Sequence, residues 1–315
     1  MGKRAYVFAT GGLGNQLFQL AAALGSECDE LRVVPNRKNA RKNLDDHLDI
    51  EDFHIGEKVI FDRDIKLWKL SQKAVNYTLR YFAGQKPEQP RKFYDSLILF
   101  AADSLLSINL RKVVHICANR GLGFDPKIQT PRIKNFFVGY FQTYRVLTKT
   151  TVNQTMFEMR VLKDSAKLNE FRMLADSEIP LIVHVRMGDY QESDLFGVLP
   201  QDYYRKAINL LWNSGKYKKI WLFSDEPEKA MNQIPDSFHQ YVRVVPDFDN
   251  STAITFEVMR LGHGYVIANS TFSWWAASLS RNITGQIAAP DIWFAKAASP
   301  EQILPPHWIK VEAWQ

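Results

Sequence analysis

Residues 180–190 read PLIVHVRMGDY, an apolar stretch that ends in a histidine, an arginine and an aspartate. Successive side chains of a strand point to opposite faces, so His184 and Arg186 share one face and Val185 takes the other. The glycine at position 188 predicts a turn directly after the strand. A histidine and an arginine inside a buried strand are costly unless they are paired. The segment therefore predicts a buried strand that ends in a polar site.

Further strands and helices alternate on both sides of this segment. The expected strands are residues 4–10, 31–35, 180–186, 219–224, 241–246, 265–269 and 285–290, and the expected helices are 15–25, 66–82, 96–114, 151–175, 200–213, 252–262 and 272–280. Such alternation is typical of parallel sheets with helices on both faces. We therefore expect an α/β fold of two Rossmann-like halves with a cleft between them, divided into domains 1–150 and 151–315.

Composition limits the class of protein. The net charge is +6, and 34 acidic residues are interspersed among 40 basic ones, which favours an anionic substrate or surface over a nucleic-acid binder. Cys28 and Cys117 give neither a disulfide framework nor a metal-binding spacing, so we expect a reducing compartment. The N-terminus does not read as a signal peptide, and no stretch reaches the roughly 18 apolar residues of a membrane span. We expect a cytoplasmic protein, at most peripheral on the inner face of the membrane.

The polar end of residues 180–190 has two interpretations. In the first, Arg186 forms a structural ion pair with Asp189. In the second, the planar fork of Arg186 binds a phosphate and Asp189 orients it. His184, which titrates near neutrality when unperturbed, then donates to a base or to a phosphate oxygen. Ligands bind beyond the carboxyl ends of parallel strands, which favours the second interpretation.

A second polar segment, NSTFSWWA at residues 269–276, follows the expected strand at 265–269. It carries one amide and three hydroxyls, from Asn269, Ser270, Thr271 and Ser273. One hydroxyl is expected to cap the next helix. The others exceed what a cap needs, and a helix N-terminus suits an anion. Trp274 and Trp275 are expected in the core.

A glycine turn, GGLGNQ at residues 11–16, follows the first strand. It lacks the lysine of a P-loop and the third glycine of the dinucleotide fingerprint. Asn15 and Gln16 offer neutral donors and acceptors for sugar hydroxyls or a phosphate, although Asn15 could also cap the helix. In a similar way, Asp225 is placed either for a ribose or base contact or as the N-cap of a helix that begins near Pro227.

One helical segment, residues 66–82, is rich in lysine and arginine. It could lie on an anionic membrane. A solvated helix face is the simpler interpretation, and the sequence favours it.

Four motifs agree with one family in order and spacing: GGLGNQLFQ at 11–19, HVRMGDY at 184–190, FSDEPE at 223–228 and NSTFSWWAASLS at 269–280. The chain thereby resembles the α-1,2-fucosyltransferases of glycosyltransferase family 11, especially the bacterial ones, over most of its length except about 36–135. The resemblance implies a GT-B-like fold. An acceptor-side N-terminal domain would face a GDP-sugar-binding C-terminal domain across a cleft.

The activity that the resemblance implies is inverting, metal-independent transfer of L-fucose from GDP-fucose, without a cofactor. The acceptor would be the 2-hydroxyl of a terminal galactose on an oligosaccharide or polysaccharide. The alternatives are a transferase for another nucleotide sugar or linkage, and a non-catalytic protein that binds nucleotides or glycans.

The resemblance also implies roles for single residues. Arg186 would hold the β-phosphate and stabilise the departing GDP, and His184 would contact the nucleotide. Asn15 would reach the reacting sugar, while Asp189 and His184 are candidates for a general base, if there is a dedicated one. The implied donor pocket contains further residues, namely Gly14, Gln16, Ser224, Asp225, Asn269, Ser270, Thr271 and Phe272.

The chain departs from the family pattern at two positions. Met187 stands where the family usually has a second arginine; it faces the opposite side of the strand from Arg186, which makes it a packing change. Thr255 stands where an aspartate would be expected to read guanine, with Glu257 nearby. The second departure weakens the predicted guanine contact.

Overall fold

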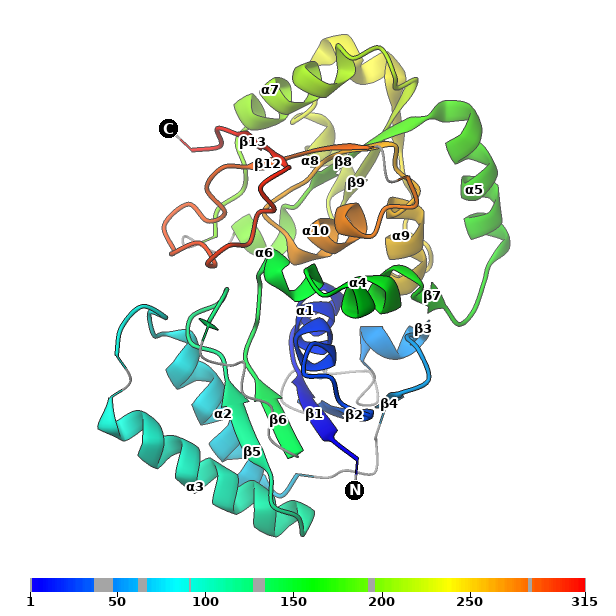
Figure 1. Cartoon of the computed structure of the whole chain (residues 1–315). Helices are drawn as coiled ribbons and strands as arrows, with labels where there is room; N and C mark the ends of the chain where they lie inside the picture. The colour runs from blue at the N-terminus through cyan, green and yellow to red at the C-terminus, as the bar shows by residue number, and fades with distance from the viewer. Residues whose placement is uncertain are drawn as a thin grey trace. The chain divides into compact units, whose positions relative to one another are not determined.

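The structure is a computed structural model that describes residues 2–36, 48–61, 67–90, 92–126, 134–191, 196–282 and 285–314, apart from the side chains of Asp189 and Gln191. The chain divides into two compact units (Figure 1). Unit 1 comprises Met1–Met159 and Pro300–Ile303, and unit 2 comprises Arg160–Ser299 and Leu304–Gln315.

Unit 1 is built on a five-stranded sheet in the order β4-β2-β1-β6-β5, with all strands parallel. The strands are β1 (Arg4–Ala9), β2 (Glu30–Pro35), β4 (Val59–Phe61), β5 (His115–Ala118) and β6 (Lys134–Val138). The helices are α1 (Leu13–Leu24), α2 (Lys69–Ala83), α3 (Phe93–Leu110) and α4 (Thr150–Phe157). Short elements complete the unit: η1 (Asp49–Asp52), β3 (Phe53–His54) and η3 (Tyr144–Leu147). Helices α2 and α3 cover the sheet face that carries Tyr6, Phe8 and Phe136.

A short segment near the C-terminus, Pro300–Ile303, belongs to unit 1. The carbonyl of Glu301 accepts the amide of Phe124 at 2.9 Å, and the carbonyl of Gln302 accepts the amide of Tyr144 at 3.0 Å. The fit is tight, because a β-carbon on Gly123 would lie 2.1 Å from the backbone nitrogen of Glu301.

Unit 2 is built on a six-stranded parallel sheet in the order β10-β9-β8-β11-β12-β13. The strands are β7 (Arg160–Val161, outside this sheet), β8 (Pro180–Val185), β9 (Lys219–Ser224), β10 (Val242–Val244), β11 (Gly264–Val266), β12 (Gln286–Pro290) and β13 (Ile309–Val311). The helices are α5 (Ala166–Glu178), α6 (Gly188–Gln191), α7 (Gln201–Trp212), α8 (Pro227–Met231), η4 (Asp236–Tyr241), α9 (Thr252–Met259) and α10 (Thr271–Ser278). Counted along the chain, the six strands follow the 3-2-1-4-5-6 order of a Rossmann fold.

The two parallel sheets confirm the predicted fold class, an α/β, GT-B-like chain of two Rossmann-like units. The alternation within β8 is also confirmed, since Val183 and Val185 pack in one core cluster with Tyr203 and Tyr204 of α7. Met187 lies in the same cluster, as a packing residue. Trp274 and Trp275 are fully buried, as expected. The cleft between the two halves stays a prediction.

One helix in the described part of the chain, α3, is long and apolar enough to cross a membrane by length and composition alone. Its 18 residues have a mean hydropathy of 1.3, and 17% of them are buried. No such segment was expected from the sequence, in which Asp95 and Asp103 interrupt the apolar run.

Candidate functional site

The candidate site lies where the strand order of unit 2 reverses. Strand β8 pairs with β9 on one side and with β11 on the other, and all three run parallel. Their carboxyl ends therefore meet at one edge of the sheet, which is where open α/β sheets bind ligands. Arg186 follows β8, Asp225 follows β9, and Ser270 lies beyond β11.

Arg186 is held by the neighbouring strand end. Its Nη1 lies 3.1 Å from Oδ2 of Asp225, and the Arg186 side chain keeps 34% of its surface exposed. The other carboxylate oxygen of Asp225 accepts the backbone amide of Met187 at 3.0 Å. Asp225 thus fixes both the guanidinium and the turn that carries it. The guanidinium remains accessible to an anionic ligand.

One of the two interpretations of Asp225 is corrected here. The N-cap of α8 is Glu226, so Asp225 does not cap that helix. The ion pair that the structure describes for Arg186 is with Asp225, whereas the side chain of Asp189 lies outside the described part, and its pairing or orienting role stays a prediction. Ser224 supports the same turn, since its Oγ accepts the amide of Glu226 at 3.0 Å.

Tyr190 connects Arg186 to the third strand end. The guanidinium carbon of Arg186 lies 5.8 Å from the centre of the Tyr190 ring, within the range of a cation–π contact. The Tyr190 hydroxyl donates to the carbonyl of Asn269 at 3.1 Å. The buried amide of Asn269 in turn donates to the carbonyls of Phe196 and Gly197, each at 3.2 Å. Asn269 therefore positions a loop with its amide nitrogen.

His184 is buried, with 6% of its surface exposed. Its Nδ1 has no hydrogen-bond partner among the described residues. Burial, with the positive charge of Arg186 adding to it, lowers the pKa of His184 to about 3, and Asp225 acts in the opposite sense. The ring is therefore neutral near pH 7, because burial holds its pKa well below the unperturbed value. A neutral imidazole can donate one hydrogen bond but is a poor general base at that pH.

The N-terminus of α10 differs from the expected cap. Ser270 occupies the N-cap position, but its side chain makes no capping hydrogen bond. The hydroxyl of Ser273 donates to the carbonyl of Ser270 at 3.2 Å. Thr271 and Phe272 are half-buried, and the Phe272 ring lies 6.4 Å from the His184 ring. The first turn of this helix thus brings the Phe272 ring near a neutral histidine.

The helix before β11 contains the second departure from the family pattern. The Thr255 hydroxyl donates back to the carbonyl of Ser251 at 3.0 Å. Glu257 is buried, and Oε1 lies 2.5 Å from Nη1 of Arg260, while Oε2 lies 3.5 Å from Nη2 of Arg281. Both side chains are thereby engaged within unit 2. Glu257 serves a buried ion pair.

The glycine turn of unit 1 forms a separate candidate surface. Helix α1 is capped by Gly12, so Asn15 is not its N-cap. The Asn15 Oδ1 instead accepts the side-chain amide of Gln142 at 2.8 Å. Gly11 has a φ of +77°, and a β-carbon there would lie 2.6 Å from Nδ2 of Asn15. Only glycine suits this conformation and this close approach.

Gln16 is a supporting residue of the same turn. Its Nε2 donates to the carbonyl of Gly11 at 2.7 Å, and its Oε1 accepts the amide of Ile50 at 3.0 Å. Gly14 is buried in the first turn of α1. The predicted contacts of Gly14 and Gln16 with the donor stay predictions.

The structure therefore brings most of the predicted residues together at one edge of unit 2: His184, Arg186, Ser224, Asp225, Asn269, Ser270, Thr271 and Phe272. The other three with described side chains, Gly14, Asn15 and Gln16, lie in unit 1. Sequence reasoning missed the role of Tyr190, although this residue belongs to the quoted HVRMGDY motif. It also missed Gln142, for which no local signal exists.

A cavity of about 330 Å³ lies in unit 1 and is lined by the C-terminal end of α1, by β5 and by β6. Glu27, Cys117, Asn135 and Lys149 are among its lining residues, and none of the predicted site residues is. Within the described ranges, no group of three or more His, Cys, Asp or Glu side chains could hold a metal ion.

Comparison with known proteins defines the class. The family described as Glycosyl transferase family 11 matches residues 122–312, more than half of the chain. The protein is a glycosyltransferase, and the chain belongs to glycosyl transferase family 11.

Two relatives come from Escherichia coli. The O-antigen biosynthesis glycosyltransferase WbnK is 36% identical over 117 residues, which are 36% of this chain and only 38% of that protein. The Alpha-1,2-colitosyltransferase is 22% identical over 315 residues, covering 96% of this chain and 97% of that protein. Among solved structures, the fucosyltransferase NodZ from Bradyrhizobium is 13% identical and covers 88% of this chain and 92% of that chain, with a TM-score of 0.48.

Proposed function

We propose that this protein transfers L-fucose from GDP-fucose to the 2-hydroxyl of a terminal galactose, with inversion and without a metal ion. The observation that carries the proposal is the Arg186–Asp225 pair at the strand-order reversal of unit 2. It holds an oriented, partly exposed guanidinium at the same edge of the sheet as the N-terminus of α10, and this combination suits a diphosphate.

The bond that breaks joins C1 of the sugar to an oxygen of the β-phosphate. Negative charge grows on that oxygen while an oxocarbenium-like sugar forms, and the acceptor oxygen forms the new bond to C1 from the opposite face. Arg186 stabilises the departing diphosphate, because its charge is already aimed before the reaction begins. The Ser270 hydroxyl and the neutral His184 supply further hydrogen bonds to the nucleotide.

The acceptor hydroxyl must lose its proton during transfer. His184 does not serve as the base, since a group with a pKa of about 3 takes up protons poorly near pH 7. Asp189 is the remaining candidate residue, and a loose transition state needs no dedicated base. Unit 1 takes the acceptor side, where Asn15, fixed by Gln142, contacts the reacting sugar.

A second candidate donor is GDP-colitose. The relative named Alpha-1,2-colitosyltransferase aligns with 96% of this chain, and its name carries the same 1,2 linkage. Colitose is the 3-deoxy counterpart of L-fucose, so the two donors differ by one hydroxyl. A site that hydrogen-bonds this hydroxyl rejects the deoxy sugar strongly, whereas an apolar site discriminates weakly.

The test uses the purified protein with GDP-fucose or GDP-colitose, a panel of β-galactosides and added EDTA. GDP release and the linkage of the product are measured. A fucosyl-α-1,2-galactose product that forms in EDTA supports the proposal. If the protein prefers GDP-colitose, the donor is GDP-colitose and not GDP-fucose. Donor binding without GDP release, with or without acceptor, would indicate a non-catalytic binder.

Arg186 variants test the phosphate role in the same assay. Arg186→Ala should lower kcat/KM by about 100-fold or more. Arg186→Lys should also fail, because a point charge does not reproduce the fork. A lysine variant with near-normal turnover would remove Arg186 from this role. Arg205→Lys, an exposed change on α7, is the matched control.

A further inference from the structure

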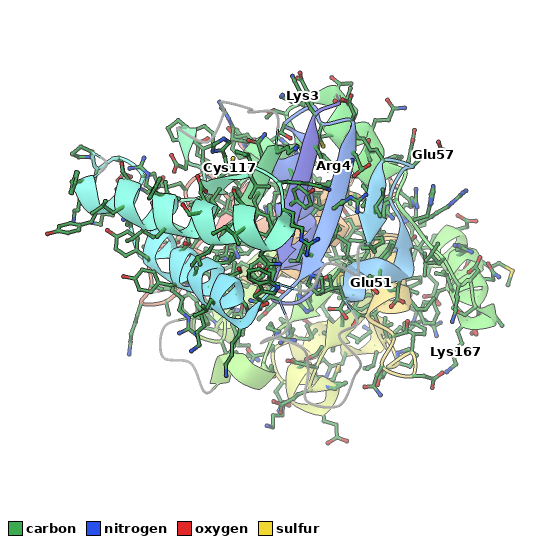
Figure 2. All side chains as sticks on the ribbon, turned by 90° about the horizontal axis from the view of Figure 1, so that it is seen from below. Lys3, Arg4, Glu51, Glu57, Cys117 and Lys167 are labelled. Atoms are coloured by element: carbon green, nitrogen blue, oxygen red, sulfur yellow. The ribbon has the colours of Figure 1, made fainter. Side chains whose placement is uncertain are left out.

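Helices α2 and α3 form an antiparallel hairpin on unit 1. The start of α2 meets the end of α3, where the Trp68 amide donates to Oδ1 of Asn109 at 2.6 Å. At the other end, the Tyr81 hydroxyl donates to Oδ1 of Asp95 at 2.9 Å. The inner sides of both helices join the core of unit 1 through Val75, Leu79, Ala102 and Leu106. Figure 2 shows the two helices side by side, with many side chains projecting outward.

The outer face of this hairpin is apolar. Of the sixteen large hydrophobic side chains that are exposed in the described part of the chain, nine lie within residues 68–113. Phe93, Leu97, Phe100 and Ile108 share one side of α3, because residues three or four apart on a helix are neighbours. Phe93 and Phe100 are 75% and 72% exposed. A contiguous patch of this kind is a marker of an interaction surface.

The same segment is strongly basic. Residues 67–113 contain eight Lys and Arg against three Asp and Glu, a balance of +5 in a chain whose net charge is +6. Two of the three acids are engaged inside unit 1: Asp95 accepts the Tyr81 hydroxyl, and Asp103 accepts the amide of Ile116 at 2.7 Å. Positive charge therefore dominates the outer side.

Five exposed cations surround the patch. Lys69, Lys73 and Arg80 lie on the exposed side of α2, and Arg111 and Lys112 follow α3. None of the five forms an ion pair with a residue in the described ranges. An exposed apolar stripe flanked by unpaired cations matches the chemistry of an anionic lipid bilayer, whose headgroups attract the cations while its acyl region takes up the apolar side chains.

We propose that this surface, the outer face of α2 and α3 with its flanking cations, docks on an anionic phospholipid bilayer. The helices lie in the interface and do not cross it, because Ala102 and Leu106 of α3 are part of the unit 1 core. A second copy of the chain is a poor occupant, since a twofold contact would bring each basic face against itself. Neither donor nor acceptor enters this inference, so it stands or falls separately from the proposed function.

The test is sedimentation of the full chain with vesicles of phosphatidylcholine alone or mixed with phosphatidylglycerol. We expect binding at least about tenfold tighter to the anionic vesicles, weakening as salt is raised. Lys69→Glu with Lys73→Glu should lower the affinity by about 25-fold or more, at about fivefold for each lysine lost. Lys216→Glu with Lys296→Glu, two exposed lysines of unit 2, should change it little.

The apolar stripe is tested in the same way. Phe93→Ser with Phe100→Ser and Ile108→Ser should lower vesicle binding by at least about tenfold. The matched control replaces Leu162, Met173 and Leu210, exposed apolar residues of unit 2, by serine. Near-UV circular dichroism and the Tm show that each variant is folded.

Four results would overturn the proposal. The first is equal binding to neutral and anionic vesicles. The second is an α3 triple variant that is folded and binds as the wild type does. The third is a wild-type dimer that this variant converts to a monomer, which would assign the surface to a second copy of the chain. Protein that resists carbonate extraction from the vesicles would also contradict docking, since it would indicate a span.

Discussion

Gly188 and Asp225 approach each other so closely that a β-carbon on Gly188 would lie 2.4 Å from Oδ2 of Asp225. That oxygen is the one paired with Arg186. The glycine after the arginine is therefore required for the ion pair, and no unusual backbone angle is involved. The glycine of the HVRMGDY motif thus allows the carboxyl ends of β8 and β9 to approach each other closely.

Gly188→Ala should disable the enzyme while leaving it folded. The added methyl group displaces the Asp225 carboxylate, and Arg186 moves with it. Because small misplacements of a positioning group are costly, we expect kcat/KM to fall by about 10- to 100-fold. GDP release from the donor measures the effect. Gly84→Ala, whose new methyl group would make only an ordinary 3.7 Å contact, is the control and should be nearly silent.

Gly11→Ala should lower stability through the backbone. Gly11 has a φ of +77°, which costs a residue with a side chain about 1–2 kcal/mol, and its new methyl group would also press on Asn15. Urea unfolding measures the loss. Gly12→Ala has nothing within 4 Å of the new methyl group and loses only the preference for glycine over alanine at the N-cap of α1, so it should cost about 0.5–1 kcal/mol. Equal losses of stability in the two variants would contradict the assignment of the Gly11 cost to its positive φ and its contact with Asn15.

His184 should make the protein less stable as the pH falls. Its pKa is about 3 in the folded chain and about 6.5 when unfolded, so between these values the unfolded chain binds a proton that the folded chain does not. The free energy of unfolding therefore rises with pH across this window, by up to about 1.4 kcal/mol per unit from this residue.

Urea unfolding of the wild type and of His184→Gln at several pH values between about 7 and 5 measures this slope. The variant should show the smaller dependence on pH, whatever its absolute stability. An unchanged slope would mean that His184 is accessible to protons in the folded chain.

Glu257→Ala should destabilise unit 2, because Glu257 serves a buried ion pair. We expect no direct contact between Glu257 and the donor. The change leaves the fully buried Arg260 without its 2.5 Å partner, and an uncompensated buried charge costs about 3–5 kcal/mol. Asp164→Ala breaks an exposed pair with Arg172 and should cost about 1 kcal/mol or less. If Glu257→Gln remains folded but loses donor affinity, Glu257 has a second role as a nucleotide contact.

The sequence predicted those features that depend on residues close together along the chain. The period-two alternation in β8 predicted the faces of His184 and Arg186, and the order of strands and glycine turns predicted the two parallel sheets. By contrast, the sequence suggested no partner for Arg186 outside its own motif, in which Asp189 lies three residues away. Asp225 is 39 residues away along the chain, and only the pairing of β8 with β9 brings it close. Such a partner depends on strand order, which no local window contains.

Two other features escaped prediction for physical reasons. The Ser270 hydroxyl makes no capping hydrogen bond. The preference of serine for N-cap positions predicts which residue begins a helix, but it does not predict the side-chain geometry of one particular turn. The exposed stripe of α3 has the same composition as a buried helix, and only its packing shows which side is covered. Hydrophobic periodicity alone cannot separate a core face from an outward apolar face.

The segment Pro300–Ile303 means that neither unit is encoded by one uninterrupted stretch of gene. A fragment that ends at Met159 would leave the amides of Phe124 and Tyr144 without their carbonyl partners, and a fragment that begins at Arg160 would carry those carbonyls away. Chimaeras that exchange unit 1 between relatives must therefore move these four residues together with the N-terminal stretch. Such hybrids inherit unit 1 in two pieces.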